Sequence, residues 1–259
     1  MQKKKFFKAE EINGASEWVL DSQNSVLSVA TLKKLHLAEG GAQEFVMHDK
    51  EALVVPVFGE LEFEFAGKKD VAQRFDAIYL TKGETCVIKA ICLSDVLICE
   101  AAAKQSYQSV LIRRKDVTPV VSGSGCYTRN VWNMVSPGVV EAERLILGYC
   151  EGTIEGGWTG WPPHEHSGNL EEIYYYYDMC GPMPGVLQMH YDDMDGKIEV
   201  DLAKNGDVFA ISSGYHPIVA LPGTLMKNLW FMAANKPEDR DFGVVRVDST
   251  FQKKEQAAR

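Results

Sequence analysis

The hydrophobic pattern along the chain is typical of β-strands rather than helices. Short apolar runs alternate with polar residues, and long stretches with apolar residues at i, i+3, i+4 and i+7 are scarce. In the first half, glycine-containing turns separate these runs. The pattern there predicts strands at Ala52–Phe58, Leu61–Ala66, Asp76–Leu80, Cys86–Ala90 and Asp95–Ala101. We therefore expect an all-β fold.

The second half repeats this rhythm, which suggests an internal duplication. Its predicted strands are Arg144–Cys150, Ile173–Asp178, Gly185–Tyr191, Lys197–Leu202, Asp207–Ile211 and Leu225–Ala233. Between the two sets, Lys115–Asn130 holds a proline and two glycines amid polar residues, as a connection would. We expect one β-barrel over residues 1–118 and a second over residues 119–259.

The composition is that of an ordinary folded protein and excludes several functions. Of 259 residues, 46% are hydrophobic, enough for one large domain or two small ones. The net charge of −9 argues against nucleic acid as a partner, because phosphate contacts need clustered Lys and Arg. No apolar stretch follows the basic residues Lys3–Lys5, so we expect neither export nor a membrane span. The cysteines form no CxxC pair and should be reduced. We expect a cytoplasmic protein with a small-molecule partner.

The segment that points most clearly to chemistry is Pro162–Tyr174, which contains two histidines one residue apart. Side chains on an extended chain alternate between two faces, so His164 and His166 project to the same face. Both imidazoles can then reach one ion. A His-x-His pair followed by a glutamate is a fairly specific indication of metal binding.

A carboxylate and a distant histidine would complete the ligand set. Glu171 and Glu172 open the next predicted strand and point to opposite faces of it, so only one can face the histidines. His216 follows a turn at Gly214 and begins another strand. Such a mixed nitrogen and oxygen shell suits Mn, Fe, Ni, Co or Zn.

Three stretches together resemble the bacterial 5-deoxy-glucuronate isomerase family of inositol catabolism, which is related to the 4-deoxy-5-ketouronate isomerases of pectin breakdown. They are PPHEHSGNLEEIYYYY, GVLQMHYDD and GDVFAISSGYHPIVALPG. The resemblance implies two cupin barrels of the double-stranded β-helix or jelly-roll type. The first half has His48 but no His-x-His pair, so we expect the first barrel to lack a metal. The resemblance implies one divalent ion, Mn, Zn or Fe, in the second barrel, and isomerisation of a uronate-like aldose to a ketose. Assembly as a homo-oligomer is expected from the same source.

The resemblance also bears on the carboxylate ligand. In this family the ligand directly precedes an apolar strand residue, which favours Glu172 before Ile173, whereas the plain His-x-His-x4-Glu spacing favours Glu171. We choose Glu172, so the expected ligands are His164, His166, Glu172 and His216.

An acidic sugar needs a cation in its binding site, and family-like segments offer Arg144, Arg129 and Lys227. Of these, Arg144 can contact a carboxylate through two parallel hydrogen bonds. An ion pair with the neighbouring Glu141 or Glu143 is an equally reasonable use of its charge. We expect Arg144 and Lys227 to bind substrate.

Uncharged groups are expected to act on the sugar as well. Strand parity from Glu172 places Tyr174 and Tyr176 inside the barrel, and Tyr174 is taken as a substrate contact. Gln188 lies on the following strand and can hydrogen-bond a hydroxyl. Tyr215, next to His216, is expected to present a hydroxyl to the reacting carbons. Tyr215 and Gln188 are therefore the candidate catalytic residues.

Departures from the family pattern keep other functions open. Glu165 stands where the family commonly has a basic residue, Ser167 where it has an acidic one and Ser212 where it has a proline. An isomerase of another hexose, a ketouronate or a sulfonated sugar is one alternative. A non-catalytic sugar-binding cupin or a cupin dioxygenase is another.

Overall fold

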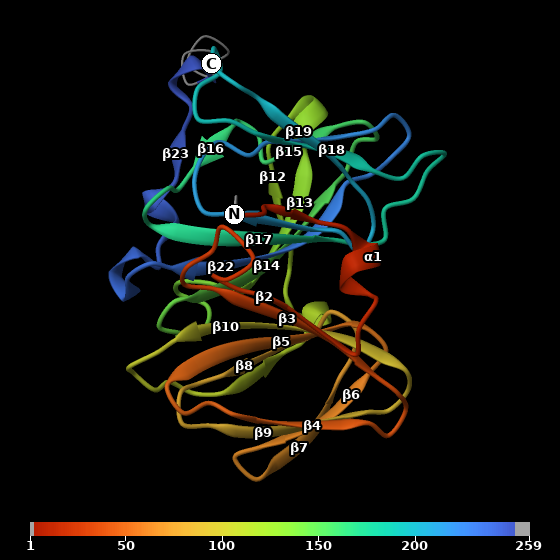
Figure 1. The fold of residues 1–259 in the computed structure, drawn as a ribbon, viewed down its shortest axis with the longest axis vertical. Coiled ribbons are helices and arrows are strands. Elements are labelled where there is room, and N and C mark those ends of the chain that lie inside the picture. Colours follow the sequence, from red (N-terminus) through yellow and green to blue (C-terminus); the bar gives the residue numbers. More distant parts are fainter. Residues whose placement is uncertain (1–2, 252–259) are drawn as a thin grey trace.

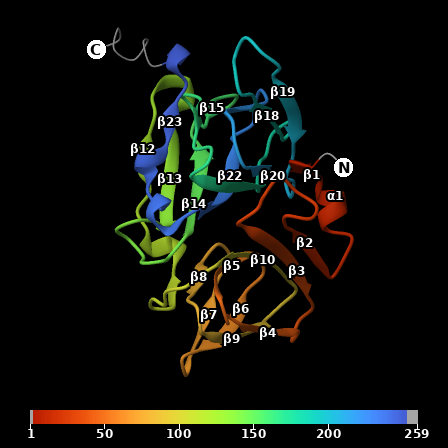
Figure 2. The same cartoon turned by 60° about the vertical axis from the view of Figure 1, so that its left-hand side comes forward.

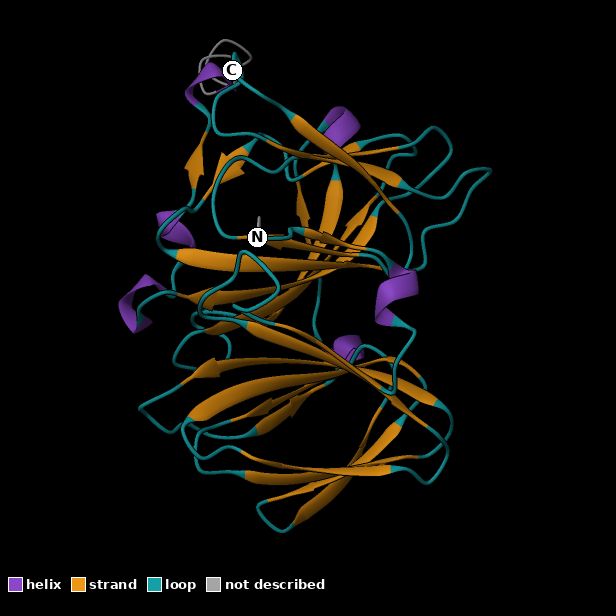
Figure 3. Ribbon diagram, viewed as in Figure 1, coloured by secondary structure: helices purple, strands orange, loops and turns teal. Residues whose placement is uncertain are grey.

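A computed structural model describes residues 3–251 of the chain as two β-barrels, one stacked on the other (Figure 1). Strands of the first half form the lower barrel and strands of the second half form the upper one. Helices are confined to short turns (Figure 3): α1 (Ala9–Ile12), η1 (Arg114–Asp116), η2 (Gly125–Tyr127), η3 (Pro237–Asp239) and η4 (Phe242–Val244). Within the described residues, no helix is long and apolar enough to cross a membrane.

The first barrel consists of two antiparallel sheets that face each other. The larger has the strand order β11 (Val110–Ile112), β8 (Ala77–Leu80), β5 (Lys50–Phe58), β10 (Ser94–Ala102), β3 (Thr31–Leu37), β2 (Glu17–Leu20). The smaller has the order β4 (Ala42–Val46), β9 (Thr85–Ala90), β6 (Leu61–Phe65), β7 (Lys68–Ala72). Alternation of buried and exposed residues along β6 and β9 shows that one face of the smaller sheet lines the barrel and the other meets solvent.

The second barrel repeats this plan. Its larger sheet has the order β1 (Phe6–Phe7), β20 (Val208–Ile211), β17 (Leu170–Tyr176), β22 (Lys227–Ala234), β14 (Leu145–Gly152), β13 (Arg129–Val135), β12 (Val120–Ser122). Its smaller sheet has the order β15 (Trp158–Thr159), β21 (Ile218–Ala220), β18 (Val186–His190), β19 (Glu199–Ala203). A separate ribbon pairs β16 (His164–Glu165) with β23 (Arg246–Val247). The order β8-β5-β10-β3-β2 thus corresponds to β20-β17-β22-β14-β13, which supports the duplication inferred from the sequence.

The expectation of an all-β fold with two cupin barrels is confirmed, and each strand predicted from the sequence is present within a few residues of its predicted ends. Strands that the hydrophobic pattern did not reveal include β3 and β13. In β3, the adjacent Lys33 and Lys34 interrupt the alternation of apolar and polar residues. Both lysines form ion pairs with acids of strand β10, Glu100 and Asp95. An ion pair lowers the cost of placing a lysine at a partly buried strand position.

The hydrophobic core has three parts. One fills the first barrel, and one fills the second. The third lies between the two larger sheets and takes side chains from both halves, including Leu53, Phe75, Tyr149 and Phe231. The large sheets are therefore buried on both faces, which explains why β17 and β22 are buried along almost their whole length, including the polar residues Glu171, Glu172 and Asn228.

The N-terminal strand does not stay with the first barrel. Strand β1 pairs with β20, so residues at the start of the chain extend the larger sheet of the second barrel (Figure 2). At the expected boundary, β11 pairs with β8 of the first barrel and β12 pairs with β13 of the second. The division at residue 118 stays a proposal.

Phe75 tests the importance of the core between the barrels. It is buried and packs against Tyr149 and Tyr177 of the second barrel, with ring centroids 5.6 and 4.5 Å away. We expect Phe75→Ala to lower the free energy of unfolding by about 3–5 kcal/mol, because it leaves a cavity where the barrels meet. The matched control Phe58→Ala removes a phenylalanine that is 54% exposed and should cost less than about 1 kcal/mol. Urea denaturation measures both, and equal losses would contradict this assignment of the core.

Candidate metal centre

The histidine pair lies on β16 and the tight turn that follows it. The turn closes through hydrogen bonds from the Asn169 and Leu170 amides to the His166 carbonyl, at 3.1 Å each. Gly168 adopts a φ of 80°, a left-handed conformation that favours glycine. The turn returns the chain to β17, so His166 lies beside the first residues of that strand. The short spacing between the histidines and the glutamate is what allows this.

A cluster of three side chains forms at this point. The ligand atoms of His166, Glu172 and His216 all lie within 4.8 Å of one another, and all three residues are buried. Glu172 Oε2 is 3.2 Å from Nε2 of both His166 and His216. The ring of His164 lies beside them, 4.9 Å from the His216 ring between centroids. The structure therefore brings together all four residues expected to bind the ion.

Each of the three histidines is held by a backbone carbonyl. Nδ1 of His164 is 3.1 Å from the Pro162 oxygen, Nδ1 of His166 is 2.8 Å from the Leu170 oxygen, and Nδ1 of His216 is 2.8 Å from the Gly214 oxygen. A carbonyl oxygen can only accept, so Nδ1 must carry the proton in each ring. The neutral form of each ring then has its lone pair on Nε2. Protein metal sites commonly fix the tautomer of their histidines in this way.

This arrangement requires a positive charge. In the neutral rings, the Nε2 lone pairs of His166 and His216 would face a carboxylate oxygen at 3.2 Å in a buried site. His216 Nε2 has no hydrogen-bond partner among the described residues. An unpaired buried polar atom is costly, and a divalent ion would satisfy both nitrogens and the carboxylate at once. The donor set therefore fits a metal ion.

The electrostatics of the residues agree with this. Burial, followed by the neighbouring His216, lowers the pKa of His164 to about 4, so this ring is neutral at pH 7. Burial opposes charge on Glu172, but the adjacent His166 and His216 rings lower its pKa to about 2. Burial also opposes charge on His166, yet Glu172 raises the pKa of this ring. The site thus offers an ionised carboxylate that attracts a cation.

Glu172, not Glu171, is the carboxylate that faces the histidines. Its neighbour Glu171 points through the opposite face of β17 toward the first barrel. There its two oxygens accept hydrogen bonds from the amides of Ser28, Val29 and Ala30. Since strand neighbours face opposite sides, only one of the two glutamates could enter the site.

A cavity of about 450 Å³ opens beside this cluster in the second barrel. His164, Glu172 and Tyr174 form one part of its wall. The remaining wall is a mixture of polar and apolar side chains from both sheets and the C-terminal segment, including Arg129, Asn133, Cys150, Met226, Asn228, Trp230, Met232, Phe242 and Val245. Tyr174 thus lies in the barrel interior, as strand parity predicted.

Arg129 is the cation that lines this cavity. Its Nη1 donates to the backbone oxygens of Tyr127 and Trp161 at 3.2 Å each. Among residues 3–251, no carboxylate lies within ion-pairing distance of its guanidinium. An arginine that lacks an acidic partner in the protein can pair with the carboxylate of a ligand.

Arg144 and Lys227, the other expected cations, do not belong to the cavity wall. Arg144 Nη1 donates to the backbone oxygens of Ala234 and Asn235 at 2.9 and 2.6 Å, beyond the end of β22. Lys227 begins β22 and pairs in register with Glu151 on β14. Strand parity explains the difference, since Asn228, the next residue, is the one that points into the cavity.

Tyr215 and Gln188 also lie outside the wall. The Tyr215 ring stacks on Tyr191 at 5.2 Å between centroids, because a pair of backbone hydrogen bonds holds these two residues opposite each other. Gln188 is fully buried, and its Oε1 accepts from the Tyr176 hydroxyl at 2.6 Å. Its Nε2 donates to the backbone oxygens of Met189 and His216. Gln188 thus supports the His216 segment rather than the cavity.

Sequence reasoning missed Asn228, Asn133 and Trp230. Asn228 is buried, and its Oδ1 has no hydrogen-bond partner within the described part of the chain. Trp230 lies across Gly148 on the adjacent strand, where a Cβ would collide with the indole. The available indication was an asparagine within the apolar run of β22, two residues before Trp230 and therefore on the same face.

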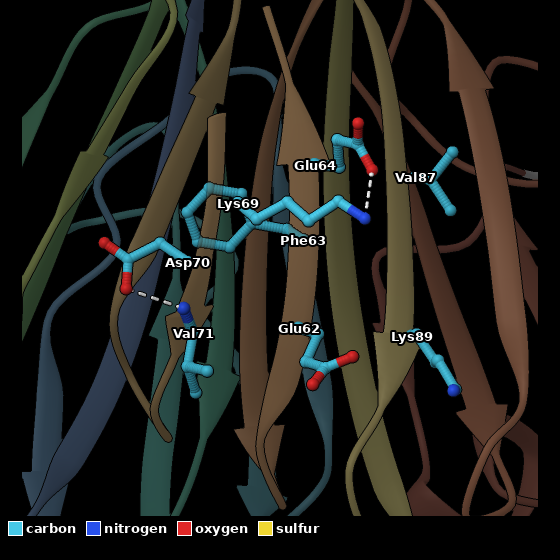
Figure 4. A pocket seen from close by; sticks show the side chains of 8 residues that line it. All are labelled: Glu62, Phe63, Glu64, Lys69, Asp70, Val71, Val87 and Lys89. Carbon is cyan, nitrogen blue, oxygen red and sulfur yellow. Dashed lines mark hydrogen bonds and ion pairs between the residues drawn. The ribbon is translucent and has the colours of Figure 1, made fainter. Parts of the chain in front are cut away.

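A second hollow, of about 520 Å³, lies on the outer face of the smaller sheet of the first barrel (Figure 4). Its rim carries alternating charges from β6, β7 and β9, and Lys69 pairs with Glu64 at 3.0 Å. These side chains are mostly exposed, as expected for a solvated sheet face. The hollow is larger than the cavity in the second barrel, but it lacks a cluster of groups that could do chemistry.

Comparison with known proteins gives a consistent result. The model of the KduI/IolB family matches residues 5–245. The chain is 27% identical to a 5-deoxy-glucuronate isomerase of Halalkalibacterium halodurans over 83% of this chain and 85% of that one. It is 25% identical to a 4-deoxy-L-threo-5-hexosulose-uronate ketol-isomerase of Lachnoclostridium phytofermentans over 52% and 51%. The crystal structure of an IolB-like protein from Salmonella typhimurium LT2 covers 91% of this chain and 94% of its own, with a TM-score of 0.80 and 22% identity.

The metal centre can be tested by removing its histidines. We expect His166→Ala and His216→Ala each to weaken Mn²⁺ binding by more than about 100-fold, since losing a ligand should cost at least as much as losing a supporting residue. His36→Ala is the control, because His36 pairs with Asp95 in the first barrel. Calorimetric titration of the metal-free protein measures the dissociation constants. Unchanged affinity in both site variants would refute the site.

Proposed function

The chain belongs to the KduI/IolB family, and on this premise we propose that it is an isomerase that converts a uronate-like aldose such as 5-deoxy-glucuronate to the ketose. The observation that carries the proposal is the convergence of three histidines and one glutamate beside a cavity, whose wall also holds an arginine without an acidic partner among the described residues. His164, His166, Glu172 and His216 would hold one divalent ion, Mn, Zn or Fe. Such an ion supplies polarisation of a sugar carbonyl or hydroxyl oxygen.

Arg129 supplies the contact for the acidic group of the sugar. Its Nη1 is fixed by two backbone oxygens, so the guanidinium stays at the cavity wall. A planar guanidinium matches a carboxylate through two parallel hydrogen bonds. This explains how a chain with a net charge of −9 can bind an anionic substrate. Arg129 thus replaces Arg144 and Lys227 in this role.

Tyr174 is the residue best placed to donate a proton or hydrogen bond near Glu172. Burial, followed by the charge of Glu172, raises the pKa of its hydroxyl well above the usual value. The hydroxyl therefore keeps its proton at neutral pH and acts as a donor, not as a base. Asn133 and Asn228 face the same cavity, and their amides can both donate to and accept from sugar hydroxyls.

Apolar side chains keep water from the reacting carbons. Phe242 and Val245, from the C-terminal segment, line the cavity with Trp230 and Met232. Trp230 offers a flat face, and Gly148 gives it room to lie against the sheet. Exclusion of water strengthens the electrostatic contacts that the cavity makes with a substrate.

Three other functions remain as candidates. One relative is a ketouronate ketol-isomerase, and such a substrate would use the same arginine and metal. A cupin dioxygenase or a non-catalytic sugar-binding cupin could also hold the ion. The departures at Glu165 and Ser167 bear less on the substrate than the sequence suggested, because Arg246 donates to Glu165 Oε1 and to the Ser167 carbonyl outside the cavity wall. A cytoplasmic location and a homo-oligomer stay predictions.

Arg129 provides the test of substrate class. We expect Arg129→Gln to lower kcat/KM for a uronate by about 10–100-fold, the equivalent of roughly 1.5–3 kcal/mol for hydrogen bonds to a charged group. The loss should be much smaller for a neutral aldose. The control Lys227→Gln changes a cation that is not part of the wall and should leave kcat/KM nearly unchanged. Initial rates of ketose formation with Mn²⁺ measure these effects.

A panel of sugars separates the alternatives. We expect turnover of 5-deoxy-glucuronate, with weaker or no turnover of a ketouronate, a neutral hexose or a sulfonated hexose. Turnover of another sugar alone would replace the substrate, and oxygen consumption in place of isomerisation would replace the reaction. Metal binding without any turnover would favour the non-catalytic reading.

A further inference from the structure

A buried glutamate links the second barrel to the first. Glu171 is 3% exposed and extends from β17 to the segment before β3. Its Oε1 accepts from the Ser28 amide at 2.6 Å and the Ser28 hydroxyl at 2.7 Å. Its Oε2 accepts from the amides of Val29 and Ala30 at 2.9 Å each. Three successive backbone amides and one hydroxyl thus bind a single carboxylate.

A second buried glutamate makes the same link in the opposite direction. Glu51, fully buried on β5, extends to the start of β14. It accepts from the amides of Glu143, Arg144 and Leu145 at 2.9, 2.7 and 2.8 Å. The Tyr79 hydroxyl donates to it at 2.7 Å. Again three successive amides and one hydroxyl are bound.

The two glutamates occupy equivalent positions in the duplicated fold. Each is the second residue of the central strand of its larger sheet. Glu51 lies opposite Ala101 on β10, and Glu171 lies opposite Ala233 on the corresponding strand β22. The residue after each one faces the interior of its own barrel. In the first barrel that residue is Ala52, within the apolar core. In the second it is Glu172.

We propose that Glu171 is a positioning residue for the metal centre, through which the first barrel holds Glu172 in place. The inference rests on the metal site of the proposed function. Four hydrogen bonds fix the Glu171 side chain to the segment before β3, and the peptide link passes this constraint to the adjacent residue. Supporting contacts of this kind commonly change metal affinity by about 10–100-fold. The first barrel thereby contributes to the site without providing a ligand.

The duplication provides a matched control. Loss of either glutamate removes four hydrogen bonds, three of them from backbone amides of the other barrel, so both changes should weaken folding alike. Only Glu171 has a metal-binding neighbour. A purely structural role predicts equal effects of the two changes on metal binding, whereas a positioning role predicts unequal ones.

Ser28→Ala and Tyr79→Phe form the mild pair. Each removes one hydroxyl donor to one of the two glutamates and leaves the backbone donors in place. We expect Ser28→Ala to raise the Mn²⁺ dissociation constant several-fold and to shift the visible absorption of bound Co²⁺, a probe of ligand geometry. Tyr79→Phe should match the unmodified protein in both measurements.

Glu171→Gln and Glu51→Gln form the strong pair. In each variant, an NH₂ group replaces one carboxylate oxygen. This group cannot accept the hydrogen bonds that the backbone amides donate. We expect Glu171→Gln to weaken Mn²⁺ binding by about 10–100-fold, with Glu51→Gln close to the unmodified protein. If a glutamine variant does not fold, the mild pair decides.

The outcomes separate this inference from the proposed function. Unequal effects within the pairs, confined to Ser28 and Glu171, support it. Equal effects within both pairs, or no effect of any variant, overturn the positioning role while the metal centre stands. Failure of the unmodified full-length protein to bind Mn²⁺ overturns the metal centre itself, and the positioning role with it.

Discussion

The site depends on a buried carboxylate that faces the unprotonated nitrogens of histidines. Glu172 Oε2 lies 3.2 Å from two Nε2 atoms, and backbone carbonyls fix the protons of all three rings on Nδ1. Lone pairs therefore converge among buried side chains. Such a cluster is unfavourable unless a cation lies among its members. The backbone around it, including the turn at Gly168 and the central position of β17, holds the cluster together.

The duplicated fold shows what this constraint changes. The interior of the first barrel is packed with apolar side chains, and Ala52 stands at the position equivalent to Glu172. The second barrel has the same strand order but uses its interior for a cavity of about 450 Å³. Burial of both faces of the larger sheets joins the barrels through a shared core and two reciprocal glutamates. The two barrels thus share a core, and the candidate metal centre lies in the second alone.

Much of the fold and part of the candidate site could be predicted from the sequence. The other features depend on contacts between residues that are distant in the chain. Strand periodicity predicted the fold, the parity of Tyr174 and the proximity of His164 to His166, because these depend on local spacing. Spacing alone left Glu171 and Glu172 open, and the family resemblance favoured Glu172, the one that faces the histidines. No local pattern revealed the role of Glu171, because its partners lie more than a hundred residues away. Arg144 was expected to bind substrate, but it donates to the backbone oxygens of Ala234 and Asn235, and the sequence pattern does not reveal such backbone partners. Polar residues such as Asn228 were hidden in an apolar strand that is buried on both faces.

Crystallography of the protein with Mn²⁺, using anomalous scattering to locate the ion, tests the central claim most directly. The account predicts one strong peak within coordination distance of Nε2 of His164, His166 and His216 and of an oxygen of Glu172. Glu171 should retain its hydrogen bonds to the segment before β3. A peak at a different set of residues, or no peak at saturating Mn²⁺, would contradict the account.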